Sequence, residues 1–185
     1  MHSADRKLVI KTVLTTLVGL ALIGAIGAWA FMMSGFYNIS STSQHLPLVY
    51  RFLEKGMHQS VRFHARGIEA PDLDDAQMVQ RGARLYHAAC VQCHGAPGIA
   101  PQGIGMGMQP VPGPLVDSDE KWRARELYWI VRHGIKMSGM PAWEYRMSEE
   151  QLWETVAFMQ KLPMMNPADY RRTTGTGAET KAVQP

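Results

Sequence analysis

The residues of this sequence that could carry out chemistry are its two cysteines, Cys90 and Cys93, and the histidine that follows them, His94. Two thiols with two residues between them are typical of metal sites, redox dithiols and haem attachment. Such thiols can add to the two vinyl groups on one edge of a porphyrin, and the next residue is then directed under the ring. An imidazole at that position can bind the iron. The motif therefore predicts one covalently attached haem c.

Two other uses of paired cysteines fit this sequence less well. A thioredoxin-like dithiol lies in a βαβ context, and no strand-like pattern flanks Cys90 and Cys93. A zinc site would need a second pair of cysteines or histidines at a suitable spacing, and the sequence offers none. The histidine directly after the second cysteine favours haem.

A haem that only transfers electrons needs a second axial ligand, and a methionine thioether raises its reduction potential. The chain has thirteen methionines. Met140 lies between Gly139 and Pro141, in a tight and rigid turn that is suited to hold a side chain over the haem. We therefore expect His94 and Met140 to be the iron ligands, in preference to three other methionines near the site: Met106, Met108 and Met137.

Helices on either side of the motif must position these ligands. A helix is expected over 75–89, capped by Asp74 or Asp72 and running into the first cysteine. The segment 96–115 is rich in Gly and Pro and is expected to be a loop around the haem edge.

Two further helices are predicted after this loop. One is capped by Ser118 or Asp119 and continues to Gly134. The last begins near Ser148, with Gln151 completing a capping box, and ends before Pro163.

An uncharged apolar segment of 22 residues, 12–33, lies near the N-terminus. As a helix it would be about 33 Å long, enough to cross the hydrocarbon core of a bilayer. Three basic residues precede it, so we expect 1–11 on the cytoplasmic side and the chain after Met33 outside. A cleaved signal peptide is the alternative, because 28–30 has the form of a cleavage site; the length of the apolar segment favours retention.

The residues that follow, 34–73, form a neck with one amphipathic helix over 48–66. Its cations lie largely off an apolar stripe, which consists of Val49, Phe52, Leu53, Met57, Ser60 and Val61. The helix can lie among lipid headgroups, pack on a partner membrane subunit or pack on the protein's own haem domain, and the sequence leaves all three open. We interpret His58 and His64 as solvated residues, not ligands.

The net charge of +3 is unevenly distributed, with +5 on residues 1–67, −3 on 68–166 and +1 on 167–185. A nucleic-acid-binding protein concentrates its basic residues on the folded domain, so we expect no nucleic-acid partner. We place the haem domain at 74–166. The segment 167–185 is predicted to be a disordered tail.

The segment from about 74 to 162, roughly half of the chain, resembles the class I cytochrome c fold. The matching pieces are 81–86, 90–95, 134–142 and 152–158. The resemblance implies an all-α fold, a small helical domain around one covalently bound haem, here preceded by an N-terminal transmembrane helix.

The same resemblance implies particular contacts around the haem. The first and last helices should cross, and a loop carbonyl should accept a hydrogen bond from the His94 imidazole. The residues expected at the crossing are Gly82, Tyr86, Trp153 and Phe158, and those expected to supply the carbonyl are Pro97 or Pro101. Contacts with the haem propionates can be assigned to Trp122, Trp143 or Arg132, although core packing or a solvated surface is the simpler interpretation of each.

The proteins that the segment resembles are small single-haem cytochromes of bacterial respiratory chains, which implies an electron carrier and not an enzyme. Its expected partners are the lipid bilayer and redox proteins: a quinol-oxidising complex or dehydrogenase as donor, and a terminal oxidase or reductase as acceptor. Its expected location is the bacterial inner membrane, single-pass, with the haem domain on the periplasmic side. The alternative is a haem relay subunit of a stable membrane-bound oxidoreductase or oxidase complex.

Overall fold

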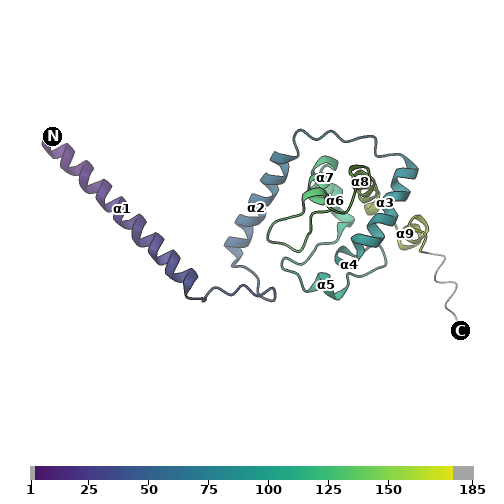
Figure 1. Ribbon diagram of the computed structural model, residues 1–185, viewed down its shortest axis with the longest axis horizontal. Helices are drawn as coiled ribbons and strands as arrows, with labels where there is room; N and C mark the ends of the chain where they lie inside the picture. Colours follow the sequence, from purple (N-terminus) through teal and green to yellow (C-terminus); the bar gives the residue numbers. More distant parts are fainter. Residues whose placement is uncertain (1–2, 177–185) are drawn as a thin grey trace. The chain divides into compact units, whose positions relative to one another are not determined.

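A computed structural model of the chain describes residues 3–176. Throughout this range the regular elements are helices, and it contains no β-strand, which confirms the predicted all-α fold class. The chain divides into two compact units, Met1–Ser43 and Gln44–Pro185 (Figure 1).

The first unit contains the helix α1, Ser3–Met33. Over Ala4–Met33 it is long and apolar enough to cross a membrane. Its large apolar side chains, such as Leu17, Ile23 and Phe31, are exposed on all sides of the helix. A helix that is apolar all round suits a membrane span, and α1 therefore fits membrane anchoring.

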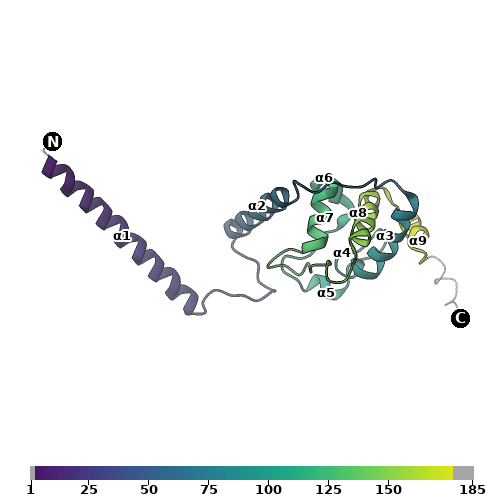
Figure 2. The same cartoon turned by 45° about the horizontal axis from the view of Figure 1, so that its top comes forward.

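The second unit is built around the crossing of α3, Ala76–Ala89, and α8, Glu149–Lys161 (Figure 2). A Cβ atom on Gly82 would overlap the carbonyl oxygen of Glu154 and lie 3.1 Å from the Cβ of Phe158. Only a glycine therefore allows the two backbones to approach this closely. Tyr86 packs on Phe158 with ring centroids 5.2 Å apart, as predicted.

One aromatic residue does not lie where it was expected. Trp153 stacks on Tyr128 of α7, with centroids 4.1 Å apart and planes inclined by 14°. It therefore joins α8 to α7, and the residue that meets Gly82 is Glu154. The side chain of Glu154 is buried and forms an ion pair with Arg81.

Capping residues explain where two of these helices begin. At α8, Ser148 accepts a hydrogen bond from the Gln151 amide, and the Gln151 side chain accepts one from the Ser148 amide, which is the predicted capping box. At α3 the cap is Asp75, whose carboxylate accepts a hydrogen bond from the Met78 amide at 2.8 Å, and neither Asp74 nor Asp72. Asp74 instead pairs with Lys161 of α8.

The predicted helix from 118 to 134 is two helices, α6 (Ser118–Lys121) and α7 (Ala124–His133). The amide of Arg123 donates a hydrogen bond to the carboxylate of Glu126 at 3.0 Å. This cap, in which the Glu126 side chain accepts from the residue before the helix, starts a new helix at Ala124 and interrupts the predicted one.

The prediction of a disordered tail over 167–185 is wrong for its first part. Residues Pro167–Thr174 form the helix α9, in which Tyr170 is 0% exposed. Its hydroxyl lies 3.0 Å from Nδ1 of His87, and its ring contacts Phe158. A single buried aromatic is enough to fix so short a helix, whereas periodicity over eight residues is too weak to reveal it. The rest of the predicted tail, 177–185, lies outside the described residues.

The neck helix is α2, Pro47–His64, close to its predicted bounds. Its last turn packs on the helical domain, because Val61 and the following Ala65 are buried. Phe52 and Leu53 from the same predicted stripe are exposed, so the stripe divides between two faces.

The remaining short elements are α4 (Val91–His94), α5 (Gly103–Met106) and the 3-10 turns Leu115–Asp117 and Leu162–Met164.

Candidate haem site

Cys93 and His94 lie in the single helical turn α4, and Cys90 is the residue that joins this turn to α3. The amide of His94 donates a hydrogen bond to the carbonyl of Cys90 at 2.9 Å, so the imidazole lies one turn after the first thiol. The Tyr86 hydroxyl donates to the carbonyl of Gly95 at 2.9 Å and so ties the end of this turn to α3. The sequence-predicted residues of the motif are therefore brought together by local helical geometry.

Both thiols are free in the structure, and they differ in environment. Cys90 is 8% exposed, and its burial raises its pKa to about 12. Cys93 is half-buried. Two unpaired thiols on one turn, beside an imidazole, are the donor set that covalent haem attachment needs.

The imidazole of His94 is oriented by a carbonyl. Its Nδ1 lies 2.8 Å from the carbonyl oxygen of Gly113, and because a carbonyl only accepts, the proton is on Nδ1 and the lone pair on Nε2. Burial lowers the pKa of His94, which favours the neutral imidazole that binds metal. The predicted hydrogen bond is thus made, but by Gly113 and by neither Pro97 nor Pro101.

The loop after the motif folds back onto it through α5. The amide of Gln102 donates to the carbonyl of Gln92 at 2.9 Å, and a Cβ on Gly105 would lie 2.8 Å from backbone atoms of Cys93. The amide of Met108 then donates to the carbonyl of Gly105 at 3.2 Å. This run of contacts places the loop against the cysteine turn.

Met140 is held by its backbone in the loop after α7. Its carbonyl accepts a hydrogen bond from the Ile135 amide at 3.2 Å, and its amide donates to the Ser138 hydroxyl at 3.1 Å. A Cβ on Gly139 would overlap the sulfur of Met108. The two loops therefore meet at Met108 and Gly139, next to the predicted ligand.

Exposed apolar side chains on these two loops fit a porphyrin. Except for Met164, the exposed large apolar residues of the helical domain after the neck all lie on the loops: Ile104, Met106, Val111, Met137 and Tyr145. A flat apolar ring can cover such side chains. Together with the two free thiols and the oriented imidazole, they make the site suitable for haem c.

Two of the residues considered for propionate contacts have protein partners instead. Arg132 pairs with Glu144 at 3.2 Å and donates to the Tyr128 hydroxyl at 3.2 Å. Trp122 stacks on His58 of α2, with centroids 4.4 Å apart and planes 9° from parallel. The interpretation of His58 as a solvated residue was therefore incomplete.

Sequence reasoning missed the carbonyl of Gly113 and the contact of Met108 with Gly139. Gly113 is nineteen residues from His94, so no local spacing links them. Gly139, next to Met140, was a signal in the sequence. A glycine indicates only that another group approaches the backbone closely, and it does not indicate that this group is Met108.

Comparison with known families identifies the family of the helical domain. Residues 77–159, slightly less than half of the chain, match the family model described as cytochrome c oxidase, cbb3-type, subunit III. The match begins in α3, contains the cysteine turn and both loops, and ends in α8. No curated protein matches this chain. The helical domain is a class I c-type cytochrome, and its chemistry is electron transfer by a bound haem.

Proposed function

We propose that this chain is a membrane-anchored electron carrier with one haem c, linked to Cys90 and Cys93 and ligated by His94 and Met140. When bound, the haem supplies an iron that takes up and releases one electron. The observation that carries the proposal is the His94 imidazole. It is oriented by the carbonyl of Gly113, and it lies within one helical turn of two free thiols.

The chain's own residues keep the iron environment fixed. The carbonyl of Gly113 fixes the tautomer and the ring orientation of His94, which keeps Nε2 available. The backbone hydrogen bonds of Met140 to Ile135 and Ser138 hold the thioether loop in one conformation. If His94 and Met140 both hold the iron of a bound haem, no position would remain for a substrate, and the domain would transfer electrons without catalysing a reaction.

Met108 is the strongest competitor for the second axial position, because its sulfur lies against Gly139. We favour Met140, since its backbone is hydrogen-bonded at both the amide and the carbonyl. In the oxidised holoprotein, Met140→Ala should abolish the thioether–ferric charge-transfer band at the red end of the visible spectrum. The matched variants Met106→Ala, Met108→Ala and Met137→Ala should keep it. Loss of the band in Met108→Ala, and its persistence in Met140→Ala, would reassign the ligand.

The location follows from α1 and the charges before it. Arg6, Lys7 and Lys11 precede the apolar segment, so we place the N-terminus in the cytoplasm and the haem domain on the periplasmic side of a bacterial inner membrane. Tethering keeps the haem at a high effective concentration near membrane partners. The donor is a quinol-oxidising complex or dehydrogenase, and the acceptor is a terminal oxidase or reductase.

A second candidate function is that of a haem relay subunit in a stable oxidase or oxidoreductase complex. It is favoured by the family that the domain matches, cytochrome c oxidase, cbb3-type, subunit III, because a member of that family is an oxidase subunit. Solubilisation of native membranes in mild detergent separates the two candidates. A catalytic subunit that co-purifies in stoichiometric amount supports the relay, and a clean monomer supports the tethered shuttle.

A further inference from the structure

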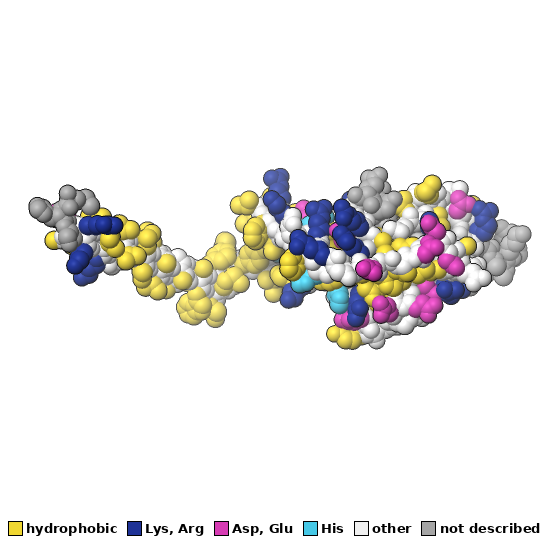
Figure 3. Space-filling view, turned by 90° about the horizontal axis from the view of Figure 1, so that it is seen from above, with side chains coloured by type: hydrophobic (Ala, Val, Ile, Leu, Met, Phe, Trp, Pro, Cys, Tyr) yellow, Lys and Arg dark blue, Asp and Glu magenta, His cyan; other side chains and the backbone are white. Residues whose placement is uncertain are grey.

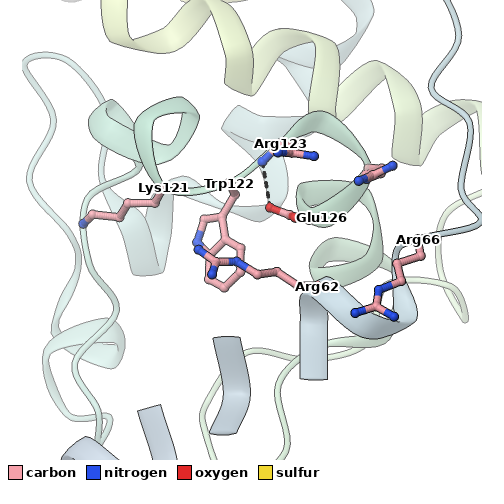
Figure 4. Close-up of a pocket in the computed structure, with 7 residues that line it drawn as sticks. Arg62, Arg66, Lys121, Trp122, Arg123 and Glu126 are labelled. Carbon is pink, nitrogen blue, oxygen red and sulfur yellow. Dashed lines mark hydrogen bonds between the residues drawn. The ribbon is translucent and has the colours of Figure 1, made fainter. Parts of the chain in front are cut away.

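A basic pocket of about 510 Å³ lies between α2 and the start of α7 (Figure 4). Five cations line it: Arg62 in α2, Arg66 two residues after α2, Lys121 at the end of α6, Arg123 between α6 and α7, and Arg125 in α7. All five cations belong to the second unit, so the pocket is formed within one compact body. None of these residues has a role in the haem site.

The lining side chains that the structure describes do not neutralise the positive charge of this pocket. Among them Glu126 is the only carboxylate; it is 6% exposed, and it already accepts a hydrogen bond from the Arg123 amide. Among the described side chains, none forms an ion pair with any of the five cations. Nε of Arg125 is buried without a hydrogen-bond partner in the described structure. The pocket is therefore suited to an anion.

The two arginines near the end of α2 are held in place by packing. Val61 and Ala65 are buried against the helical domain, and His58 stacks on Trp122, which itself lines the pocket. His64 stacks on Trp129 with centroids 5.7 Å apart. This part of α2 is fixed on α7, so the helix that carries Arg62 does not need to be ordered when a ligand binds.

The opposite face of α2 is apolar and exposed. Leu48 is 80% exposed and Phe52 is 77% exposed, and three helical turns after Phe52 the exposed ring of Phe63 lies on the same face. Arg51, Lys55 and Arg62 recur at intervals of four and seven residues along one edge of this face. In Figure 3 dark blue Lys and Arg side chains gather beside yellow apolar ones in this part of the unit. An apolar face bordered by cations is typical of helices that lie on a lipid surface.

Chain length keeps α2 close to any bilayer that α1 enters. Helix α1 ends at Met33 and α2 begins at Pro47, with residues 34–46 between them. Even fully extended, a connection of this length spans no more than about 45 Å. The surface that α2 can reach is therefore a membrane surface.

We propose that the five-cation pocket binds the phosphate of an anionic membrane glycerophospholipid, while Leu48, Phe52 and Phe63 lie on the acyl chains. Guanidinium groups bind phosphate oxygens in a bidentate way, and arginines supply four of the five cations. A lipid satisfies both features at once, because its phosphate and its apolar chains are covalently joined. A free phosphate would leave the apolar face uncovered.

The test uses the full-length holoprotein in detergent micelles, with lipid binding measured by native mass spectrometry. Titrations with phosphatidylglycerol, phosphatidylcholine and inorganic phosphate distinguish an anionic lipid from a neutral lipid and from a free anion. Arg62→Gln with Arg66→Gln should weaken phosphatidylglycerol binding by about 30-fold, from the usual contribution of a basic residue near an anionic surface. The variant with Arg62→Lys and Arg66→Lys should lose less.

A matched control removes two cations elsewhere. Arg84→Gln with Arg171→Gln makes the same change in net charge at exposed positions outside the pocket, and should bind phosphatidylglycerol like the wild type. The proposal is overturned if the control and the pocket variant weaken binding equally, or if inorganic phosphate binds the wild type as tightly as phosphatidylglycerol. It is also overturned if the pocket variant shifts the haem spectrum and leaves lipid binding intact, because the cations would then serve the haem propionates. The Met140 test is independent of all these outcomes.

Discussion

The crossing of α3 and α8 and the pair of loops around Met140 are stabilised in different ways. At the crossing, Tyr86 and Phe158 are fully buried by the protein itself, and Gly82 lets the two backbones touch. The loops keep large apolar side chains, such as Ile104 and Tyr145, exposed and are tied down by a few backbone hydrogen bonds. The helices thus form a core of their own, while the loops offer surface to a cofactor.

This difference suggests that the helices and the loops of this small domain have separate roles. A domain of this size buries a modest core, and a covalent cofactor adds what the chain cannot supply. The crossing determines where the cysteine turn starts, since Cys90 directly follows α3. The loops contribute the carbonyl that orients His94 and the proposed ligand Met140, so they would determine the surroundings of a bound iron.

The largest effect that we expect comes from removing haem attachment. Cys90→Ala with Cys93→Ala should abolish the cooperative thermal transition, because the loops lose the ring that covers their apolar side chains. The loss would amount to the whole free energy of unfolding, about 5 to 15 kcal/mol for a domain. Circular dichroism during heating measures it. A cooperative melt in this variant would show that the crossing alone sustains the fold.

A methyl group at the crossing should have the next largest effect. In Gly82→Ala the added Cβ overlaps the Glu154 carbonyl, so α3 and α8 must separate, and we expect a loss of about 3 kcal/mol or more. Gly103→Ala is the matched control in the loop, because no atom lies within 4 Å of its Cβ position, and it should change stability by less than about 0.5 kcal/mol. Chemical denaturation of both holoproteins tests the contrast, and equal effects would refute it.

The helix α9 extends the helical core, and removing its buried side chain should lower the stability of the domain. Tyr170→Ala removes a fully buried ring that contacts Phe158, so we expect a loss of about 3 kcal/mol. Tyr170→Phe keeps the ring and loses only the hydrogen bond to His87, at a cost of about 1 kcal/mol. If both variants were as stable as the wild type, α9 would not belong to the core.

The smallest effect concerns the surface pair of Asp74 and Lys161, which links the start of α3 to the end of α8. The hydrogen bond and charge of Lys161 lower the pKa of Asp74 below its usual 3.8. The pair therefore stabilises the fold above this value, and its contribution is lost as the pH falls through the lower folded pKa. The melting temperatures of wild type and Asp74→Asn should differ slightly at neutral pH and converge below pH 3.8. A difference that persists in acid would exclude this explanation.

Several elements of the domain could be predicted from sequence because their signals are local. The Ser148 cap, the end of α1 at Met33 and the spacing of Cys90, Cys93 and His94 each depend on residues only a few positions apart, whereas α1 begins nine residues before the predicted apolar segment, at Ser3. The glycine at the crossing was expected from the resemblance to the cytochrome c fold; it meets the expected Phe158, but its nearest contact is Glu154 and not Trp153.

The features that sequence could not predict depend on distant partners. His94 and Gly113, Met108 and Gly139, and His87 and Tyr170 are each far apart in the chain, and no periodic pattern links them. The break before Ala124 is different, because it depends on one side chain, Glu126, which prefers to cap the Arg123 amide. Propensity alone does not distinguish a cap from a mid-helix residue.

The burial of Cys90 has a consequence for how the protein is assembled. A thiol that is 8% exposed, with a pKa raised to about 12, provides almost no nucleophilic thiolate at neutral pH. Residues 90–94 emerge during synthesis and export well before α8 and α9, the helices that complete the core around α3. For the proposed haem linkage, we therefore expect the thioether bonds to form on the still open chain, before the C-terminal helices close over Cys90.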